Sequence, residues 1–323
     1  MTDRLGRSID YLRISVTDRC NLRCAYCMPP DGVPALRHGE ILRYEEILRV
    51  VRILSKHGIR HLRITGGEPM ARRGCLDLVR SLRGIPGILS VAMTSNGALL
   101  DGRIGEAAEA GLTGLNLSLD TLNRETYAAL TRGGDVEAVK RTLEQAVAHG
   151  IPTKLNAIPM RGINEGELTE LAGLAKRLPV CVRFIELMPI GCAGDLVPIP
   201  LPEVVARLTE AFGPLPEDTA VHGKGPAAYV RPEGFQGSVG FISALSHEFC
   251  ERCNRVRLTA DGMLKLCLNH ARGLDLREML RSGAPDGEIE SAMCAAIAEK
   301  PARHNFQERI ADRERRRMNE IGG

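Results

Sequence analysis

The sequence predicts an α/β fold in which six βα units build a parallel sheet, followed by a smaller α+β extension. Between residues 11 and 187, short β-branched or aliphatic segments alternate with longer segments of helical pattern. Several of the helical segments end in glycine, which commonly stops a helix. After about residue 190 the alternation gives way to a Pro- and Gly-rich stretch, GCAGDLVPIPLPE. Six consecutive βα units fit a partial or complete barrel with right-handed crossovers.

The predicted elements follow one another in a regular order. The six strands are 11–16 (YLRISV), 61–65 (HLRIT), 88–94 (ILSVAMT), 112–119 (LTGLNLSL), 152–158 (PTKLNAI) and 180–187 (VCVRFIEL). The main helical segments are 44–58, 76–84, 102–111, 136–150 and 167–178. In sheets of this kind, ligands bind at the C-terminal ends of the strands. We therefore expect the residues that end or follow these strands to share one mouth.

The extension has a different pattern, and it divides the chain into predicted domains 1–190 and 191–323. A helix is expected at 203–212, and short strands are expected at 227–231 and 238–243. The segment RVRLTADGMLKLCL reads as a hairpin, because Asp261-Gly262 is a strong turn signal. One more helix and a polar tail, RIADRERRRMNEIGG, complete the prediction.

Composition excludes several classes of protein. Hydrophobic residues make up 44% of the 323 residues, which is typical of a globular chain. Aromatic residues make up only 3%, without Trp, which disfavours broad stacking on single-stranded nucleic acid. No apolar stretch is long enough to span a bilayer, and the N-terminal residues lack a secretory pattern. We therefore expect a cytoplasmic protein, in which ten cysteines indicate metal ligation or catalysis rather than disulfides.

Three cysteines crowd into the segment CNLRCAYCMPP: Cys20, Cys24 and Cys27. Pro29 and Pro30 disfavour a continuing helix, so we expect the cysteines on a loop after the first strand. Structural zinc takes four ligands, whereas a [4Fe–4S] cluster takes one ligand per iron. Three thiolates therefore fit a cluster whose fourth iron is open to a small molecule, and zinc remains the alternative.

The spacing C-x3-C-x2-C, with an aromatic residue before the last cysteine, resembles the signature of radical S-adenosylmethionine (SAM) enzymes. The segment GGEP, at 66–69 after the second strand, resembles the SAM-binding motif of that family. The resemblance implies that SAM chelates the open iron through its amino and carboxylate groups. It also implies that Gly67 lets the backbone approach the methionine moiety and that Tyr26 lies by the adenine. Ser118 and Met188 resemble SAM contacts, although by themselves they read as a strand residue and a core residue.

A second trio, Cys250, Cys253 and Cys267, has the spacing C-x2-C-x13-C. His270 and His247 lie three residues beyond it on either side. A Cys₃His zinc site and an iron–sulfur cluster are both physically reasonable for this segment. The remaining cysteines are scattered and are expected to be small buried apolar residues: Cys75, Cys181, Cys192 and Cys294.

Spaced motifs over nearly the whole chain are similar to those of the GTP 3′,8-cyclases, the family of molybdenum cofactor biosynthesis protein A. They are YLRISVTDRCNLRCAYCMP, ITGGEP, TSNG, LNLSLD, RFIELMPIG, CNRVRLTADGMLKLCL and IGG. The resemblance implies a partial (βα)6 TIM-like radical SAM barrel with a C-terminal α+β extension. It also implies that the second trio holds a second [4Fe–4S] cluster at which the guanine of GTP binds. His270 would then be a bystander, and Gly322-Gly323 would enter the active site.

A bound triphosphate needs several converging cations, and arginine offers planar, bidentate geometry for it. By position and resemblance the expected GTP contacts are Arg13, Arg63, Thr94, Lys154, Arg183, Arg255 and Arg257. Arg255 and Arg257 are expected to share one face of a strand, and they are assigned to catalysis together with the first cysteine trio. Many relatives carry Lys at the position of His61, so one phosphate cation is missing or pH dependent here. The run Arg313–Arg317 is expected to be a solvated, charged segment.

The resemblance implies a complete reaction. One electron cleaves SAM to methionine and a 5′-deoxyadenosyl radical, which takes the C3′ hydrogen of GTP, and the C3′ radical then adds to C8 of guanine. The product would be (8S)-3′,8-cyclo-7,8-dihydroguanosine 5′-triphosphate, in the first step of molybdenum cofactor biosynthesis. The implied partners are an unidentified electron donor, a second copy of the chain and a downstream cyclic pyranopterin monophosphate synthase, with no nucleic acid or membrane.

Three alternative functions are also compatible with the sequence. They are a radical SAM peptide-modifying enzyme with an auxiliary cluster, a two-cluster electron carrier and a zinc-stapled nucleic-acid binder. A peptide-modifying enzyme usually has a longer, cysteine-richer C-terminal segment, and an electron carrier would need no GGEP segment. Metal content separates the zinc protein from the others.

Overall fold

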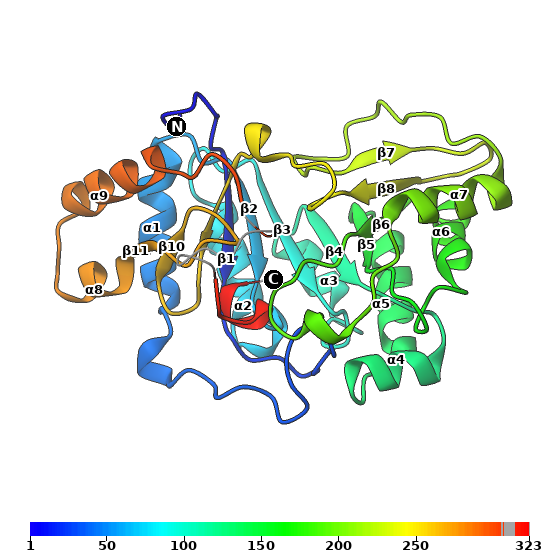
Figure 1. The fold of residues 1–323 in the computed structure, drawn as a ribbon. Helices are drawn as coiled ribbons and strands as arrows, with labels where there is room; N and C mark the ends of the chain where they lie inside the picture. Colours follow the sequence, from blue (N-terminus) through cyan, green and yellow to red (C-terminus); the bar gives the residue numbers. More distant parts are fainter. Residues whose placement is uncertain (305, 307–313, 323) are drawn as a thin grey trace.

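One continuous β-sheet forms the centre of the molecule. The computed structural model describes residues 1–304, 306 and 314–322. In these ranges the sheet has eleven strands in the order β11-β10-β9-β1-β2-β3-β4-β5-β6-β8-β7 (Figure 1). The six central strands are parallel: β1 (Tyr11–Ser15), β2 (His61–Thr65), β3 (Ser90–Ser95), β4 (Gly114–Ser118), β5 (Thr153–Ala157) and β6 (Cys181–Ile185). The predicted α/β architecture with a parallel sheet is therefore confirmed.

The crossovers between the central strands are helical, as the sequence predicts. They contain α1 (Tyr44–Lys56), α2 (Cys75–Arg83), α3 (Ile104–Glu109), α4 (Arg124–Thr131), α5 (Val136–Ala148) and α6 (Leu168–Arg177). Helix α4 was not predicted, because it is short and precedes a Gly-Gly turn. Asn123 caps it by accepting from the backbone of Glu125 and Thr126, and Arg132 ends it with a left-handed φ of 58°.

Alternation along each central strand separates the core from the inner face of the curved sheet. Leu12 and Ile14 are fully buried in the main core, as are Leu62 and Ile64 on the next strand. Burial of such side chains contributes roughly 1.5–3 kcal/mol each. The intervening residues point the other way, because successive strand side chains alternate between faces. The inner face of the sheet thus carries the polar side chains of the central strands.

Strands from the extension enlarge the sheet at both edges. Parallel β8 (Ser238–Ile242) and antiparallel β7 (Ala228–Val230) follow β6. At the other edge, β9 (Arg255–Leu258) lies parallel to β1, and β10 (Met263–Lys265) and β11 (Gly273–Asp275) continue antiparallel. The predicted hairpin is confirmed, with Gly262 at a φ of 94° in its turn. The division at residue 190 stays a prediction, and the sheet runs across it.

The other helices of the described ranges are short or lie in the extension. They are α7 (Leu201–Phe212), α8 (Leu276–Arg281), α9 (Asp286–Ala298), α10 (Met318–Ile321) and the 3-10 turns η1 (His38–Glu40), η2 (Pro69–Ala71), η3 (Ala193–Asp195) and η4 (Cys250–Arg252). Figure 1 shows α10, in red, in front of the middle of the sheet. Within the described residues, no helix has the length and apolar character needed to cross a membrane.

Candidate active site

The first cysteine trio lies on a loop that is fixed to the GGEP segment by backbone hydrogen bonds. The amide of Gly67 donates to the carbonyl of Thr17 at 2.7 Å, and the amide of Glu68 donates to that of Arg19 at 2.8 Å. A Cβ atom on Gly67 would overlap the carbonyl oxygens of Asp18 and Arg19. Only glycine at position 67 therefore lets the GGEP segment pack this closely against the loop that carries the cysteines.

A fully buried carboxylate joins GGEP to the next strand end. Glu68 accepts from the Ser95 hydroxyl at 2.9 Å and from the Asn96 amide at 2.8 Å. Burial raises the pKa of Glu68 to about 7. The Asn96 side chain in turn donates to Asn21 Oδ1 at 2.9 Å and lies 3.8 Å from Cys20 Sγ. The loops after three strands thus form one bonded unit around the cysteines, and Glu68 was not predicted as part of it.

Asp120 positions the aromatic residue of the first trio. Its Oδ2 accepts from the hydroxyl of Tyr26 at 2.7 Å, and its Oδ1 accepts from the amide of Ile158 at 2.8 Å. Burial raises the pKa of Asp120 to about 6. The sequence showed Asp120 at the end of the LNLSLD segment, but its partner became visible only in three dimensions.

The first trio occupies a buried and acidic environment. Burial raises the pKa of Cys20 to about 11, and the nearby Glu68 adds to this rise. Burial likewise raises the pKa of Cys24 to about 12, with Asp120 adding to it. The pKa of Cys27 is also raised, by burial first, and the nearby Cys192 contributes. Cys192 was expected to be a buried core residue, but it is half-buried and lies near this trio. Cys181 and Cys294 are also half-buried, against the same expectation, whereas Cys75 is buried as expected.

Cations lie near Cys253 of the second trio, whereas burial raises the pKa of Cys250, with Glu248 nearby. Cys250 begins η4, Cys253 ends it, and Cys267 follows β10. Burial raises the pKa of Cys253, but Lys300 and Arg255 outweigh it and bring the pKa down to about 7. The two trios therefore differ in electrostatic character, although they carry the same ligand atoms.

The segment near the second trio is held from the N-terminal side of the chain. Arg7 is buried and donates to the carbonyls of Cys250 and Ala302 at 3.0 and 3.1 Å, and to those of Lys300 and Pro301 at 2.9 and 2.8 Å. Nothing in the sequence alone linked the first residues of the chain to this trio.

Ligand spacing bears on which metal each trio fits. A single zinc ion with thiolates at about 2.3 Å would draw its ligand atoms close together. Among the described residues, the one group whose ligand atoms all lie within 4.8 Å of one another is Glu248, Cys250 and His304. Neither cysteine trio is among the groups with that spacing in the described part of the chain. His304 is the histidine whose ring nitrogen lies within this distance of Cys250, and His270 Nε2 lies 3.2 Å from the carbonyl oxygen of the preceding residue, Arg303.

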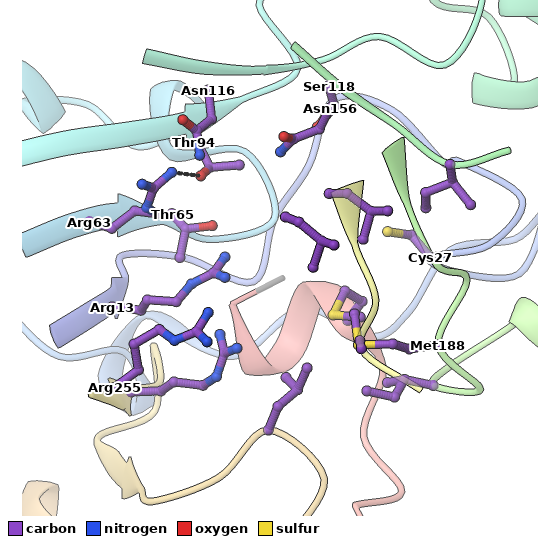
Figure 2. A pocket seen from close by; sticks show the side chains of 18 of the residues that line it. Arg13, Cys27, Arg63, Thr65, Thr94, Asn116, Ser118, Asn156, Met188 and Arg255 are labelled. Carbon is purple, nitrogen blue, oxygen red and sulfur yellow. Dashed lines mark hydrogen bonds between the residues drawn. The ribbon is translucent and has the colours of Figure 1, made fainter. Parts of the chain in front are cut away.

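Arginines from neighbouring strands converge between the two trios. Arg13 lies in register with Arg63 on one side and with Arg257 on the other. Burial, Arg257 and Arg63 lower the pKa of Arg13, and burial with Arg255 lowers that of Arg257 to about 10. Figure 2 shows the head groups of Arg13, Arg63 and Arg255 on one side of the pocket. Crowded cations of this kind attract a polyanion.

Further polar contacts fix the inner face around these arginines. Arg63 Nη1 donates to Thr94 Oγ1 at 3.3 Å (Figure 2). Arg183 Nε donates to Asn156 Oδ1 at 2.9 Å. Arg257 Nη1 donates to the carbonyl of Gly322 at 3.3 Å, which places Gly322 against one of these arginines. Gly323 and Arg313 lie outside the described residues.

Almost all the predicted site residues line one cavity of about 350 Å³. They are Cys20, Cys24, Cys27, Cys250, Cys253, Cys267, Tyr26, Gly67, Ser118, Met188, Arg13, Arg63, Thr94, Arg183, Arg255 and Arg257. Lys154 lines an adjoining cavity instead, together with His61. Arg63 borders both cavities, so the two are neighbours.

Known protein families match both parts of the chain. Residues 14–175 match the radical SAM superfamily, and residues 180–306 match the family described as Molybdenum Cofactor Synthesis C. Relatives include the GTP 3′,8-cyclases of Pelotomaculum thermopropionicum at 48% identity, Moorella thermoacetica at 44% and Clostridium perfringens at 40%. Each match covers 100% of this chain and 100% of the relative.

Solved structures share the fold at low sequence identity. Streptococcus suis SuiB, bound to its precursor peptide SuiA, has a TM-score of 0.60 at 14% identity, covering 91% of this chain and 70% of its own. The [FeFe]-hydrogenase maturase HydG has a TM-score of 0.51 at 18% identity, covering 64% of this chain and 50% of its own. These likenesses show a common fold and do not extend to substrate.

Proposed function

This chain belongs to the GTP 3′,8-cyclase family of radical SAM enzymes, and from that premise we propose how its own residues divide the work. The family reaction converts GTP into (8S)-3′,8-cyclo-7,8-dihydroguanosine 5′-triphosphate, the first step of molybdenum cofactor biosynthesis. The observation that carries the assignment of residues is the single cavity, because both cysteine trios and the arginines between them line it.

Cys20, Cys24 and Cys27 would hold a [4Fe–4S] cluster. Backbone hydrogen bonds fix the loop that carries these cysteines to the GGEP segment, which fits that role. When bound, this cluster and SAM together supply the electron and the 5′-deoxyadenosyl radical that removes the C3′ hydrogen of GTP. The chain's own residues position the reactants. Tyr26, held by Asp120, and Gly67 would border SAM and orient it.

Ser118 and Met188 would complete the SAM-binding side of the cavity. Both residues line the cavity, and Figure 2 shows Met188 on the same side as Cys27, away from the arginine head groups. In this proposal they orient the cofactor and take no part in proton or electron transfer. Asp120, whose pKa burial raises to about 6, would act through the hydroxyl of Tyr26 as a positioning residue.

The arginines would bind the triphosphate. Charge-assisted, bidentate hydrogen bonds to phosphate oxygens suit Arg13, Arg255 and Arg257, because Arg13 on β1 lies in register with Arg257 on β9 and Arg255 is two residues earlier on β9. Arg63, Arg183 and Thr94 would contact the nucleotide from the neighbouring strands. Lys154 would serve the far end of the triphosphate, where the two cavities adjoin: Lys154 Nζ now donates to the carbonyl of His222.

The second trio would hold a second [4Fe–4S] cluster next to the guanine base. The cationic surroundings of Cys253 support this, because a cluster held by three thiolates brings negative charge. A zinc site made of Glu248, Cys250 and His304 is the specific alternative, and the iron content per chain decides between them. A cytoplasmic location, a homodimer, an electron donor and the downstream synthase stay predictions.

The proposed function is tested by turnover under anaerobic conditions. The chain is reconstituted with iron and sulfide, reduced, and mixed with SAM, with and without GTP. We expect 5′-deoxyadenosine to form in a GTP-dependent manner, together with a nucleotide product that is isomeric with GTP. SAM cleavage at the same rate with and without GTP would support radical SAM chemistry but contradict GTP as the substrate. It would favour the peptide-modifying alternative.

A further inference from the structure

A second cavity of about 470 Å³ lies at the N-terminal ends of the central strands. It adjoins the active-site cavity, since Tyr11, Arg63, Asn116 and Lys224 border both. The first residues of β2 to β6 line it, together with a loop that precedes β7. The proposed reaction gives this cavity no chemical role beyond Lys154, although it contains a cysteine and a histidine in contact.

Cys181, His222 and Asp218 form a hydrogen-bonded chain at this cavity. Cys181 Sγ lies 3.2 Å from His222 Nδ1, and His222 Nε2 lies 2.8 Å from Asp218 Oδ2. A carboxylate oxygen accepts, so the proton of a neutral imidazole belongs on Nε2. The lone pair of Nδ1 then faces the thiol, which is the arrangement of a nucleophile beside its base.

Asp218 is fixed in this role by several donors. The Ser238 hydroxyl donates to Oδ2, Arg231 Nη2 lies 3.0 Å from the same oxygen, and the amide of Ala220 donates to Oδ1 at 3.0 Å. Burial alone would raise the pKa of Asp218, but these donors and His222 hold it well below its usual range. Only 8% of the Asp218 side chain and 12% of the His222 side chain are exposed. The carboxylate therefore stays ionised and keeps the imidazole oriented.

The surroundings of Cys181 are cationic. Cys181 lies in register with Lys154, and Arg183 follows two residues later on the same strand. Burial raises the pKa of the Cys181 thiol above its usual value, and Asp218 adds to the rise, while the charges of Lys154 and Arg183 only partly offset it. The thiol is half-buried, and its contact with the imidazole of His222, rather than a lowered pKa, is the feature that would activate it.

We propose that Cys181 is a base-assisted nucleophilic thiol and a covalent modification site for peroxides and other small electrophiles. With a peroxide, the thiol proton moves to His222 Nδ1, the sulfur attacks one oxygen, and the O–O bond breaks. The sulfur is oxidised to a sulfenic acid, the peroxide is reduced, and the leaving hydroxide takes the proton from the imidazole as water. With an alkyl halide, a C–S bond forms and halide leaves, without a change of redox state.

Modification at Cys181 also bears on substrate binding, and this consequence rests on the proposed function. Lys154 and Arg183 flank the thiol, and both are proposed to serve the nucleotide. A group added to Cys181 would occupy space beside these cations, and a sulfinate or sulfonate would add negative charge. GTP and the modifying reagent should therefore exclude each other.

The test measures alkylation of individual cysteines in the anaerobic, cluster-loaded protein. Limiting iodoacetamide is added at pH 7, the reaction is quenched at intervals, and digested peptides are quantified by mass spectrometry. Cys294 is the internal reference, because it is also half-buried and burial likewise raises its pKa, with Glu290 adding to the shift. We expect Cys181 to react at least about 10-fold faster than Cys294.

Two variants identify the base. His222→Gln keeps a hydrogen-bonding side chain but removes the base, and should slow Cys181 to about the rate of Cys294, within 2-fold. His57→Gln is the control, because His57 is a similarly half-buried histidine paired with Glu290 at 2.8 Å. It should leave the rate at Cys181 unchanged.

Other outcomes overturn the proposal. If Cys181 reacts no faster than Cys294, it is an ordinary structural thiol. If His222→Gln speeds the reaction, the histidine only holds the loop closed over the thiol. If Cys181 is alkylated fast and saturating GTP does not slow the reaction, Cys181 is a nucleophile but does not lie beside the bound triphosphate. The two claims can therefore fail separately.

Discussion

The two cysteine trios present the same ligand atoms, but their electrostatic environments differ at Cys253, while burial raises the pKa of Cys250 as it does those of the first trio. Burial with nearby carboxylates keeps the thiols of the first trio protonated, and the pKa of Cys24 reaches about 12. Lys300 and Arg255 act the other way at the second trio, where the pKa of Cys253 is about 7. This difference matches the charges of the ligands proposed for the two trios. The carboxylates lie near the first trio, where SAM with its sulfonium cation would bind, and the cations lie near the second, where GTP with its triphosphate would bind.

The two trios also differ in how the chain holds them. Backbone hydrogen bonds between strand-end loops fix the first trio, as Gly67 and Glu68 show. The second trio depends on a side chain far away in sequence, because Arg7 binds four carbonyls around it. The first trio is thus part of the barrel, and the second is assembled by packing of the extension against the barrel. Predictions that separate the two trios follow from this contrast.

The largest expected effect is on SAM cleavage. Cys24→Ala removes a ligand of the first cluster, so 5′-deoxyadenosine formation should fall to background and iron per chain should fall by about half. Cys253→Ala should lose a similar amount of iron and abolish GTP turnover, but leave the first cluster in place. Iron analysis and 5′-deoxyadenosine measurement check both. Equal loss of all iron in both variants would show that the trios are not independent.

The thiols should differ strongly in reactivity before metal is bound. In the iron-free chain at pH 7, about half of Cys253 is thiolate, whereas a pKa of about 12 leaves Cys24 almost fully protonated. We expect iodoacetamide to label Cys253 at least about 100-fold faster than Cys24. The rate at Cys253 should level off above pH 8, while the rate at Cys24 keeps rising. Similar pH profiles for both would refute the electrostatic contrast.

Arginine substitution should affect GTP without affecting the clusters. Arg255→Ala removes a charge-assisted contact to the triphosphate, which corresponds to a loss of about 10- to 100-fold in GTP affinity. Arg80→Ala is the matched control, because Arg80 is exposed and pairs with Asp77 at 2.8 Å. Equilibrium binding and iron analysis measure the two effects. Loss of iron in Arg255→Ala would show that the residue is structural.

The smallest expected effect concerns His61. Burial lowers the pKa of His61, so the imidazole is neutral at pH 7 and offers no cation to the neighbouring cavity. His61→Lys should therefore strengthen GTP binding about 3-fold at pH 7. Wild-type affinity should rise below pH 6, as His61 gains its proton, and this rise should be absent in the variant. An identical pH profile in both proteins would exclude His61 from the phosphate site.

Much of the barrel could be predicted from sequence because local patterns determine it. The six central strands lie where alternating apolar residues placed them, and the Pro29-Pro30 pair correctly indicated a loop for the first trio. Helix α4 was missed because its helical pattern is short and its start depends on a cap by Asn123. The Arg255 and Arg257 pair does line one cavity, as alternation around buried Val256 predicts.

Contacts between distant segments could not be predicted. The sequence alone did not indicate that Glu68 would accept from the TSNG segment, that Arg7 would hold the second trio, or that His304 would lie beside Cys250. Lys154 was grouped with the arginines by strand position and resemblance, yet it lines the adjoining cavity. Such features depend on tertiary packing, which brings residues together regardless of local pattern.

The most direct test of the central claim uses GTP deuterated at C3′. The anaerobic, reconstituted and reduced protein is mixed with SAM and the labelled nucleotide, and 5′-deoxyadenosine is examined by mass spectrometry. If the cavity holds C3′ against the SAM-binding side, the deuterium is transferred and appears in 5′-deoxyadenosine. Formation of 5′-deoxyadenosine without deuterium, at the same rate with and without GTP, would contradict the account.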